Sequence, residues 1–207
     1  MYDVRRASAG DVEELALVLA RAFVLDPVAL DLFPPGRGRH ARLSRFFSLQ
    51  LRHTYLQRGE VLTIEDRTAV ALVIWPDAPR LGAVHKLLAL QQLSLLGGRV
   101  VAAQRMARVI AASHPRAAHA YLGTIATAPE HQREGRGSEL IRSILERCDA
   151  SGLFCCLEAS TLENVRFYER FGFEQTCTIA TRGGGPLLHA MRRPPCTRAM
   201  SPTAGLA

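Results

Sequence analysis

Residues 125–138, Ile-Ala-Thr-Ala-Pro-Glu-His-Gln-Arg-Glu-Gly-Arg-Gly-Ser, decide the fold of this chain. They predict a short apolar strand, a turn, and a helix that opens at Gln-x-x-Gly-x-Gly. The first amides of a helix have no acceptor within the helix, the helix dipole adds positive potential, and glycines let an anion approach the backbone. Arg133 and Arg136 add positive side chains at the same place. The stretch therefore predicts a phosphate-binding loop.

Two common phosphate motifs do not fit this loop. A dinucleotide fingerprint requires a third glycine three residues after Gly137, where the chain has Leu140. A P-loop requires Gly-Lys-Ser/Thr, and the single lysine of the chain, Lys86, lies far upstream. Gly135 and Gly137 alone are also compatible with an ordinary glycine turn, so a second motif is needed to decide.

That second motif follows another apolar strand, which ends at Leu157-Glu158-Ala159-Ser160. The next residues include Asn164-Val165-Arg166-Phe167-Tyr168-Glu169-Arg170-Phe171-Gly172-Phe173. In their order, context and spacing, the two segments together resemble the GCN5-related N-acetyltransferase (GNAT) family. In that family the first motif holds the pyrophosphate of acetyl-CoA, and the second supplies a tyrosine at the cofactor sulfur. The resemblance implies an α/β (α+β) fold with a mixed, mostly antiparallel twisted sheet of about six to seven strands flanked by helices.

The resemblance also implies the cofactor-binding residues. The backbone of Ile125, Ala126 and Thr127 would lie along the pantetheine arm. The pyrophosphate would be held by Arg133, Glu134, Gly135, Arg136, Gly137 and Ser138. Asn164 would hydrogen-bond the pantetheine or cap its own helix. In many relatives the cofactor-binding asparagine stands where this chain has Thr161.

Acyl transfer to an amine also needs an acid and a base. Tyr168 would be the general acid, because a phenol has a pKa of about 10 and a thiol one of about 8.5, so the phenol is protonated when the thiolate leaves. Glu158 is the first candidate for the general base. His119, Tyr121 and His189 are alternatives, and a water chain would make a dedicated base unnecessary. An aromatic wall for the acceptor could be formed by Phe23, Phe33, Phe47, His53, Tyr55 and Trp75. Each of them is equally compatible with a place in the core, and the core is the favoured place for Phe46 or Phe47.

The expected reaction moves an acetyl group from acetyl-CoA to a primary amine of a small molecule by direct attack in a ternary complex. A looser resemblance to the puromycin N-acetyltransferases suggests an aminonucleoside or antibiotic as the acceptor. It rests on segments such as Arg-Ala-Ser-x-x-Asp-Val at residues 6–12 and Ala-Phe-x-x-Asp-Pro at residues 22–27. Two alternatives stay open. One is acetylation of proteins or peptides, and the other is a non-catalytic acyl-CoA-binding sensor.

Composition bounds the remaining properties. The chain has 207 residues, 48% of them hydrophobic and 22% charged, which is typical of one globular domain. We expect a single domain over residues 1–193 and a disordered tail over residues 194–207. The net charge of +7 comes from scattered arginines without a basic run, so we expect capture of an anionic cofactor and no nucleic acid partner.

The chain shows no apolar run of membrane length and no signal peptide, which predicts a cytoplasmic protein without a membrane partner. The five cysteines lack C-x-x-C spacing, so no metal site is expected. A monomer and a homodimer are both left open.

Periodicity and turn residues predict the remaining elements. The expected strands span residues 3–7, 61–65, 70–75, 121–127, 153–158, 173–181 and 187–191, with a glycine turn at 183–185. The expected helices span residues 12–23, which Asp26-Pro27 ends, 40–57, 81–96, 98–113, 135–150 and 162–171.

Overall fold

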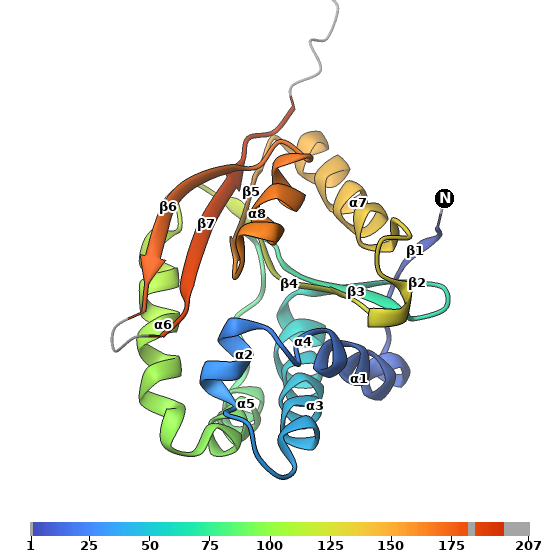
Figure 1. Cartoon of the computed structure of the whole chain (residues 1–207). Coiled ribbons are helices and arrows are strands. Elements are labelled where there is room, and N and C mark those ends of the chain that lie inside the picture. Colours follow the sequence, from blue (N-terminus) through green and yellow to red (C-terminus); the bar gives the residue numbers. More distant parts are fainter. Residues whose placement is uncertain (1, 182–184, 197–207) are drawn as a thin grey trace, which may run out of the picture.

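A seven-stranded sheet in the order β1-β2-β3-β4-β5-β7-β6 runs through the computed structural model, which describes residues 2–181 and 185–196 (Figure 1). All neighbouring strands are antiparallel except β4 and β5, which are parallel. The prediction of a mixed, mostly antiparallel sheet is therefore confirmed. The strands are β1 (Val4–Arg6), β2 (Glu60–Ile64), β3 (Ala69–Ile74), β4 (His119–Thr127), β5 (Phe154–Ala159), β6 (Glu174–Ala180) and β7 (Leu187–Arg193).

Helices cover both faces of the sheet (Figure 1). They are α1 (Val12–Ala22), α2 (Pro27–Leu32), α3 (Arg39–Gln50), α4 (Leu56–Arg58), α5 (Ala83–Leu96), α6 (Val100–Ser113), α7 (Arg136–Ala150) and α8 (Leu162–Glu169). One core packs the inner faces of α7 and α8 against the sheet, and a second packs α1, α2 and α3 against the other face. A smaller cluster around Met106 packs α6 against β6 and β7. None of the helices in the described residues is long and apolar enough to cross a membrane.

The sheet divides into two arms between β4 and β5. These strands pair over only three residues, the last pair being Tyr121 with Cys156. On its other side β4 carries a bulge, because Leu72 pairs with Thr124 and Val73 pairs with Leu122, which leaves Gly123 without a partner. A bulge bends its strand and increases the local twist. β4 consequently diverges from β5 and leaves a fork between the two strands.

Two helical segments differ from the prediction. Asp26-Pro27 was expected only to end the first helix, but it also begins α2. The Asp26 carboxylate accepts hydrogen bonds from the amides of Val28 (2.9 Å) and Ala29 (3.1 Å), and Pro27 occupies the first helical turn, where no amide donor is required. The helix expected over residues 40–57 is divided by a π-helical turn at Leu51–Tyr55.

The predicted glycine turn lies largely outside the described residues, since Gly183 and Gly184 are not described. The same holds for most of the predicted tail, residues 197–207.

Candidate active site

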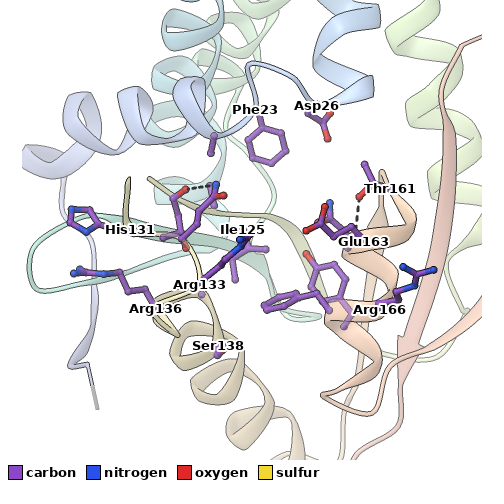
Figure 2. A pocket seen from close by; sticks show the side chains of 18 of the residues that line it. Phe23, Asp26, Ile125, His131, Arg133, Arg136, Ser138, Thr161, Glu163 and Arg166 are labelled. Atoms are coloured by element: carbon purple, nitrogen blue, oxygen red, sulfur yellow. Dashed lines mark hydrogen bonds between the residues drawn. The ribbon is translucent and has the colours of Figure 1, made fainter. Parts of the chain in front are cut away.

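A cleft of ≈ 880 Å³ opens at the fork, between the α1–α2 connection, the end of β4, the start of α7 and α8 (Figure 2). Phe23 and Asp26 lie on one wall, and Thr161 and Glu163 lie at the start of α8 on the other. Ten of the residues predicted for the site line it: Ile125, Ala126, Thr127, Arg133, Gly135, Arg136, Gly137, Ser138, Asn164 and Tyr168. Glu134 and Glu158 do not line it.

The start of α7 is shaped to receive an anion. Gly135 and Arg133 both have left-handed backbone conformations, with φ of 86° and 67°, and no side chain caps the helix. The hydrogen bond from the Glu139 amide to the Gly135 carbonyl (3.1 Å) closes the first turn of α7, so the amides of the preceding residues have no acceptor in the helix. A Cβ on Gly137 would lie 3.3 Å from Oγ1 of Thr127, so a larger residue would narrow the approach. These residues fit a phosphate group.

The guanidinium of Arg136 forms its ion pairs and hydrogen bonds with other residues of the protein. It pairs with Asp66 and donates to Oγ1 of Thr68 (2.6 Å) and Oε2 of Glu134 (2.8 Å). The Asp66 and Glu134 carboxylates raise the pKa of Arg136, and the guanidinium lowers the pKa of Glu134. Arg136 therefore ties the β2–β3 turn to the start of α7. Within the described part of the chain no carboxylate pairs with Arg133. Arg133 lines the cleft, so its positive charge is available to an anionic ligand there.

Tyr168 lies on the inner face of α8. Its side chain packs edge-on against Phe167 and Phe173, at ring separations of 5.3 and 5.7 Å, and the residue is 8% exposed. Burial raises the pKa of Tyr168 well above its usual range. The phenol therefore keeps its proton at any physiological pH and can act only as a donor toward a developing negative charge.

Thr161 and Asn164 both reach the cleft at the start of α8. The Asn164 amide donates to Oγ1 of Thr161 (3.2 Å), so Thr161 is the N-cap of the helix. The side chain of Asn164 is exposed and donates to Oγ of Ser160 (3.4 Å). The capping role that sequence reasoning allowed for Asn164 thus belongs to Thr161, and Asn164 is left to face the cleft.

Glu158 lies on the opposite face of β5. Cys155, Leu157 and Ala159 belong to the core under α7 and α8, so the alternation of side chains along a strand directs Glu158 to the other face. There Tyr121 donates to Oε2 of Glu158 (2.8 Å), and Nε2 of His114 lies 3.2 Å from Oε1.

The structure therefore brings together Glu158, Tyr121 and His119 of the candidate bases, because Nε2 of His119 lies 3.4 Å from Nδ1 of His114. His189 pairs with Ala159 and so faces the other side of the sheet. Sequence reasoning missed His114, whose position before Pro115 indicates only the end of a helix.

Most of the residues considered for an aromatic wall lie in the core, which is the alternative that the sequence left open for each of them and favoured for Phe47. Phe33, Phe47 and Tyr55 are buried in the core beneath α1 and α3. Trp75 packs against the α7 core, where its Nε1 donates to Oε2 of Glu60 (2.8 Å) and the Arg147 guanidinium lies 4.2 Å from the ring centre. Of these aromatic residues only Phe23 lines the cleft.

Comparison with known proteins defines the class of protein. Residues 87–175 match the family described as "Acetyltransferase (GNAT) domain". A Corynebacterium glutamicum structure titled "histone acetyltransferase HPA2 and related acetyltransferase" is 27% identical, with a TM-score of 0.73 over 96% of this chain and 99% of that one. The matched segment and the shared fold are those of the GNAT acetyltransferases, which agrees with the resemblance that the two motifs carry. This chain is therefore an acetyltransferase, and the enzymes of this family use acetyl-CoA as their co-substrate.

More distant structures share the fold. The Escherichia coli ribosomal-protein-S18-alanine N-acetyltransferase is 16% identical, with a TM-score of 0.53 and complete coverage of both chains. Arylalkylamine N-acetyltransferase 2 from Aedes aegypti is 14% identical, with a TM-score of 0.57 over 93% of this chain and 98% of that one. The similar structures therefore include enzymes named for protein acceptors and for small amines.

Proposed function

We propose that this enzyme moves the acetyl group of acetyl-CoA to the primary amine of a small molecule, by direct attack while both substrates are bound. One observation carries the proposal. A single cleft holds the uncapped start of α7 and the phenol of Tyr168, with the end of β4 between them. In the proposed complex the start of α7 binds the diphosphate of acetyl-CoA, and Tyr168 donates a proton at the thioester end of the same molecule.

The binding half of the cleft uses backbone groups. The amides of Arg136, Gly137 and Ser138 bind the diphosphate, and Arg133 adds a charge-assisted contact. Beyond Tyr121 the edge of β4 that faces β5 has no strand partner among the described residues. Backbone groups of Ile125 to Thr127 on that edge bind the pantetheine arm and polarise the thioester carbonyl.

The catalytic half uses one donor and one acceptor. Tyr168 donates to the sulfur as the carbon–sulfur bond breaks. Because its pKa is raised, we expect the hydrogen bond itself to provide most of the stabilisation of the thiolate. Glu158 accepts the proton that the attacking amine loses. Its carboxylate is oriented for this role by Tyr121.

A protein or peptide acceptor is the second candidate, because the 27% identical structure is titled a histone acetyltransferase. A third possibility, an acyl-CoA sensor without turnover, is disfavoured by Tyr168, since binding alone needs no donor at the sulfur. Asp26 and Glu163 at the cleft would attract a cationic acceptor of either kind.

Release of free thiol from acetyl-CoA tests the proposal. Purified protein is incubated with a panel of small amines that includes puromycin, and in parallel with histone-tail and N-terminal peptides. Thiol release with a small amine supports the proposal, and release with peptides alone transfers the assignment to the second candidate. Tight CoA binding without thiol release across both panels supports the sensor and refutes both enzymatic assignments.

We further propose that the enzyme is cytoplasmic, acts as a monomer or homodimer, and needs neither metal nor nucleic acid. If an aminonucleoside is the acceptor, acetylation would inactivate it as an antibiotic. Thiol release that is unchanged by a chelator is the expected result for an enzyme without a metal.

A further inference from the structure

A continuous chain of side chains leads from the closed end of the fork toward the surface. Both oxygens of Glu158 have partners, Tyr121 on one and His114 on the other. His114 continues through its Nδ1 to Nε2 of His119 (3.4 Å), and Nδ1 of His119 lies 2.8 Å from the carbonyl oxygen of Ala117. The side chain of Glu158 is 6% exposed and that of His114 is 20% exposed. The chain thus connects a buried carboxylate to a partly exposed imidazole.

The carbonyl of Ala117 determines which nitrogen atoms of His119 and His114 carry protons. A carbonyl oxygen only accepts, so Nδ1 of His119 carries a proton. In neutral His119 the other nitrogen, Nε2, is an acceptor, and Nδ1 of His114 donates to it. Nε2 of His114 then presents a lone pair to Oε1 of Glu158, and this contact is attractive only with one proton between the two atoms.

When all of these contacts are hydrogen bonds, the row of side chains therefore holds one proton more than two neutral histidines and an ionised Glu158 would hold. That proton resides on the Glu158 carboxyl, on a His114 imidazolium or on a His119 imidazolium. Each position is reached from the previous one by a shift along an existing contact, without movement of a side chain. An arrangement of this kind stores a proton and can also pass it on.

We infer that His114 and His119 carry the amine proton from Glu158 to solvent during acetyl transfer, a role that rests on the proposed function of Glu158 as the general base. The steps balance. An N–H bond of the amine breaks and an O–H bond forms on Glu158. The Oε1 proton passes to Nε2 of His114, and the Nδ1 proton of His114 passes to Nε2 of His119. The His119 imidazolium then returns one proton to water, and exchange with solvent moves the remaining His114 proton from Nε2 back to Nδ1 before the next turnover.

The ionisable side chains around Glu158, His114 and His119 keep one charge state, so changes of charge are limited to these three residues. The titratable and charged side chains that face them are Tyr121 from β4, Cys156 from β5, Tyr55 from the π-helical turn and Arg192 from β7. Burial raises the pKa of Tyr121 well above its usual range, that of Tyr55 to about 12 and that of Cys156 to about 11. These three groups stay neutral at physiological pH, and arginine stays charged.

A small cavity lies beside the relay. It has a volume of ≈ 130 Å³ and is lined by Glu158, His114, Cys156 and Arg192, among others. This is large enough for ordered water, and its lining supplies several polar partners. Solvent can therefore meet the relay at His114 as well as at His119.

Steady-state kinetics with an accepted amine test the relay. We compare wild type with His114→Gln and His119→Gln, and use His40→Gln, an exposed residue on α3, as the matched control. We expect kcat to fall by about 10-fold in both relay variants, below the full effect of losing a general base. The KM for acetyl-CoA should not change. The acidic limb of the kcat/KM profile should shift in His114→Gln, because the variant lacks the imidazole that shares a proton with Glu158.

Chemical rescue separates relay from structural support. Removing the ring in His114→Ala enlarges the cavity, and added imidazole should restore part of kcat, while thermal unfolding checks that the variant is folded. Variants that keep the wild-type kcat and pH profile overturn the relay and leave the proposed function intact. A fall in kcat without imidazole rescue and without a shifted pH limb also overturns it. A wild-type enzyme that releases no thiol with any amine removes the relay and the proposed function together.

Discussion

Replacing Gly123 by alanine should destabilise the protein through a single contact. A Cβ at this position would lie 2.1 Å from the hydroxyl oxygen of Tyr55, more than 1 Å closer than the contact distance of about 3.5 Å. Tyr55 is 6% exposed and packed in the core under α1 and α3, so its ring cannot turn aside into solvent. We expect Gly123→Ala to lower the free energy of unfolding by about 1–3 kcal/mol, the usual cost of overpacking. For a chain of this size, each kcal/mol lowers Tm by about 2–4 °C.

A double-mutant cycle isolates that contact. In a Tyr55→Phe background the nearest remaining atoms would be Cε1 of Tyr121 at 3.2 Å and Cζ of residue 55 at 3.3 Å, which small shifts can accommodate. Gly123→Ala should then cost less than about 1 kcal/mol, so the coupling energy should be at least about 1 kcal/mol. Urea unfolding provides both values, with Gly98→Ala as a control because a Cβ there meets nothing within 4 Å. Equal destabilisation in both backgrounds would refute the proposed close contact between β4 and the π-helical turn.

Three further predictions concern the cleft and the pH dependence of stability. Tyr168→Phe should lower kcat by about 10²–10⁴-fold and leave the KM for acetyl-CoA unchanged, as measured by thiol release; wild-type turnover would exclude Tyr168 as the donor. Gly137→Val should raise the KM for acetyl-CoA by about 10-fold, a loss of about 1.4 kcal/mol of binding, because the side chain enters the approach to the amides of α7 next to Thr127, and an unchanged KM would place the diphosphate elsewhere. Hydrogen bonds from Arg5 and Ser8 lower the pKa of Asp11, so its stabilisation is complete above about pH 4 and is lost as pH falls through the lowered pKa of the folded state. In urea titrations at several pH values, the free energy of unfolding of Asp11→Asn should fall less steeply toward acid pH than that of wild type. A fall as steep as that of wild type would contradict this assignment.

Most elements could be predicted from local sequence. The strand, loop and helix from residue 119 to residue 150 match the prediction closely, because strand alternation, two glycines and the helical period all act over a few residues. α2 was missed for an equally local reason. Asp-Pro can end one helix and begin the next, and only the hydrogen bonds of Asp26 to the following amides show that it does both.

Local sequence could not predict the contacts that long side chains make with residues far away along the chain. Trp75 ends a predicted strand, but the side it faces depends on the register of β3 against β4 and on the position of α7. One-residue changes in register reverse the face to which a side chain points. The bulge at Gly123 changes the register between β3 and β4 shortly before Trp75. Phe33, Phe47 and Tyr55 lie on helical segments, and only the packing of these segments against the sheet decides that their rings are buried.

The sequence alone predicted the uncapped glycine loop at the start of α7, which we propose binds the diphosphate, because its donors are backbone amides and its shape depends on glycines and helix start signals that are adjacent in the chain. It also placed Tyr168 after that loop in the order typical of the family. Only the tertiary structure decided the partners of Glu158. His114 and Tyr121 are 44 and 37 residues away along the chain, and they meet this carboxylate because β4 and β5 pair for three residues and then diverge. The physical reason is that backbone chemistry is local, whereas the meeting of side chains requires the whole sheet to fold.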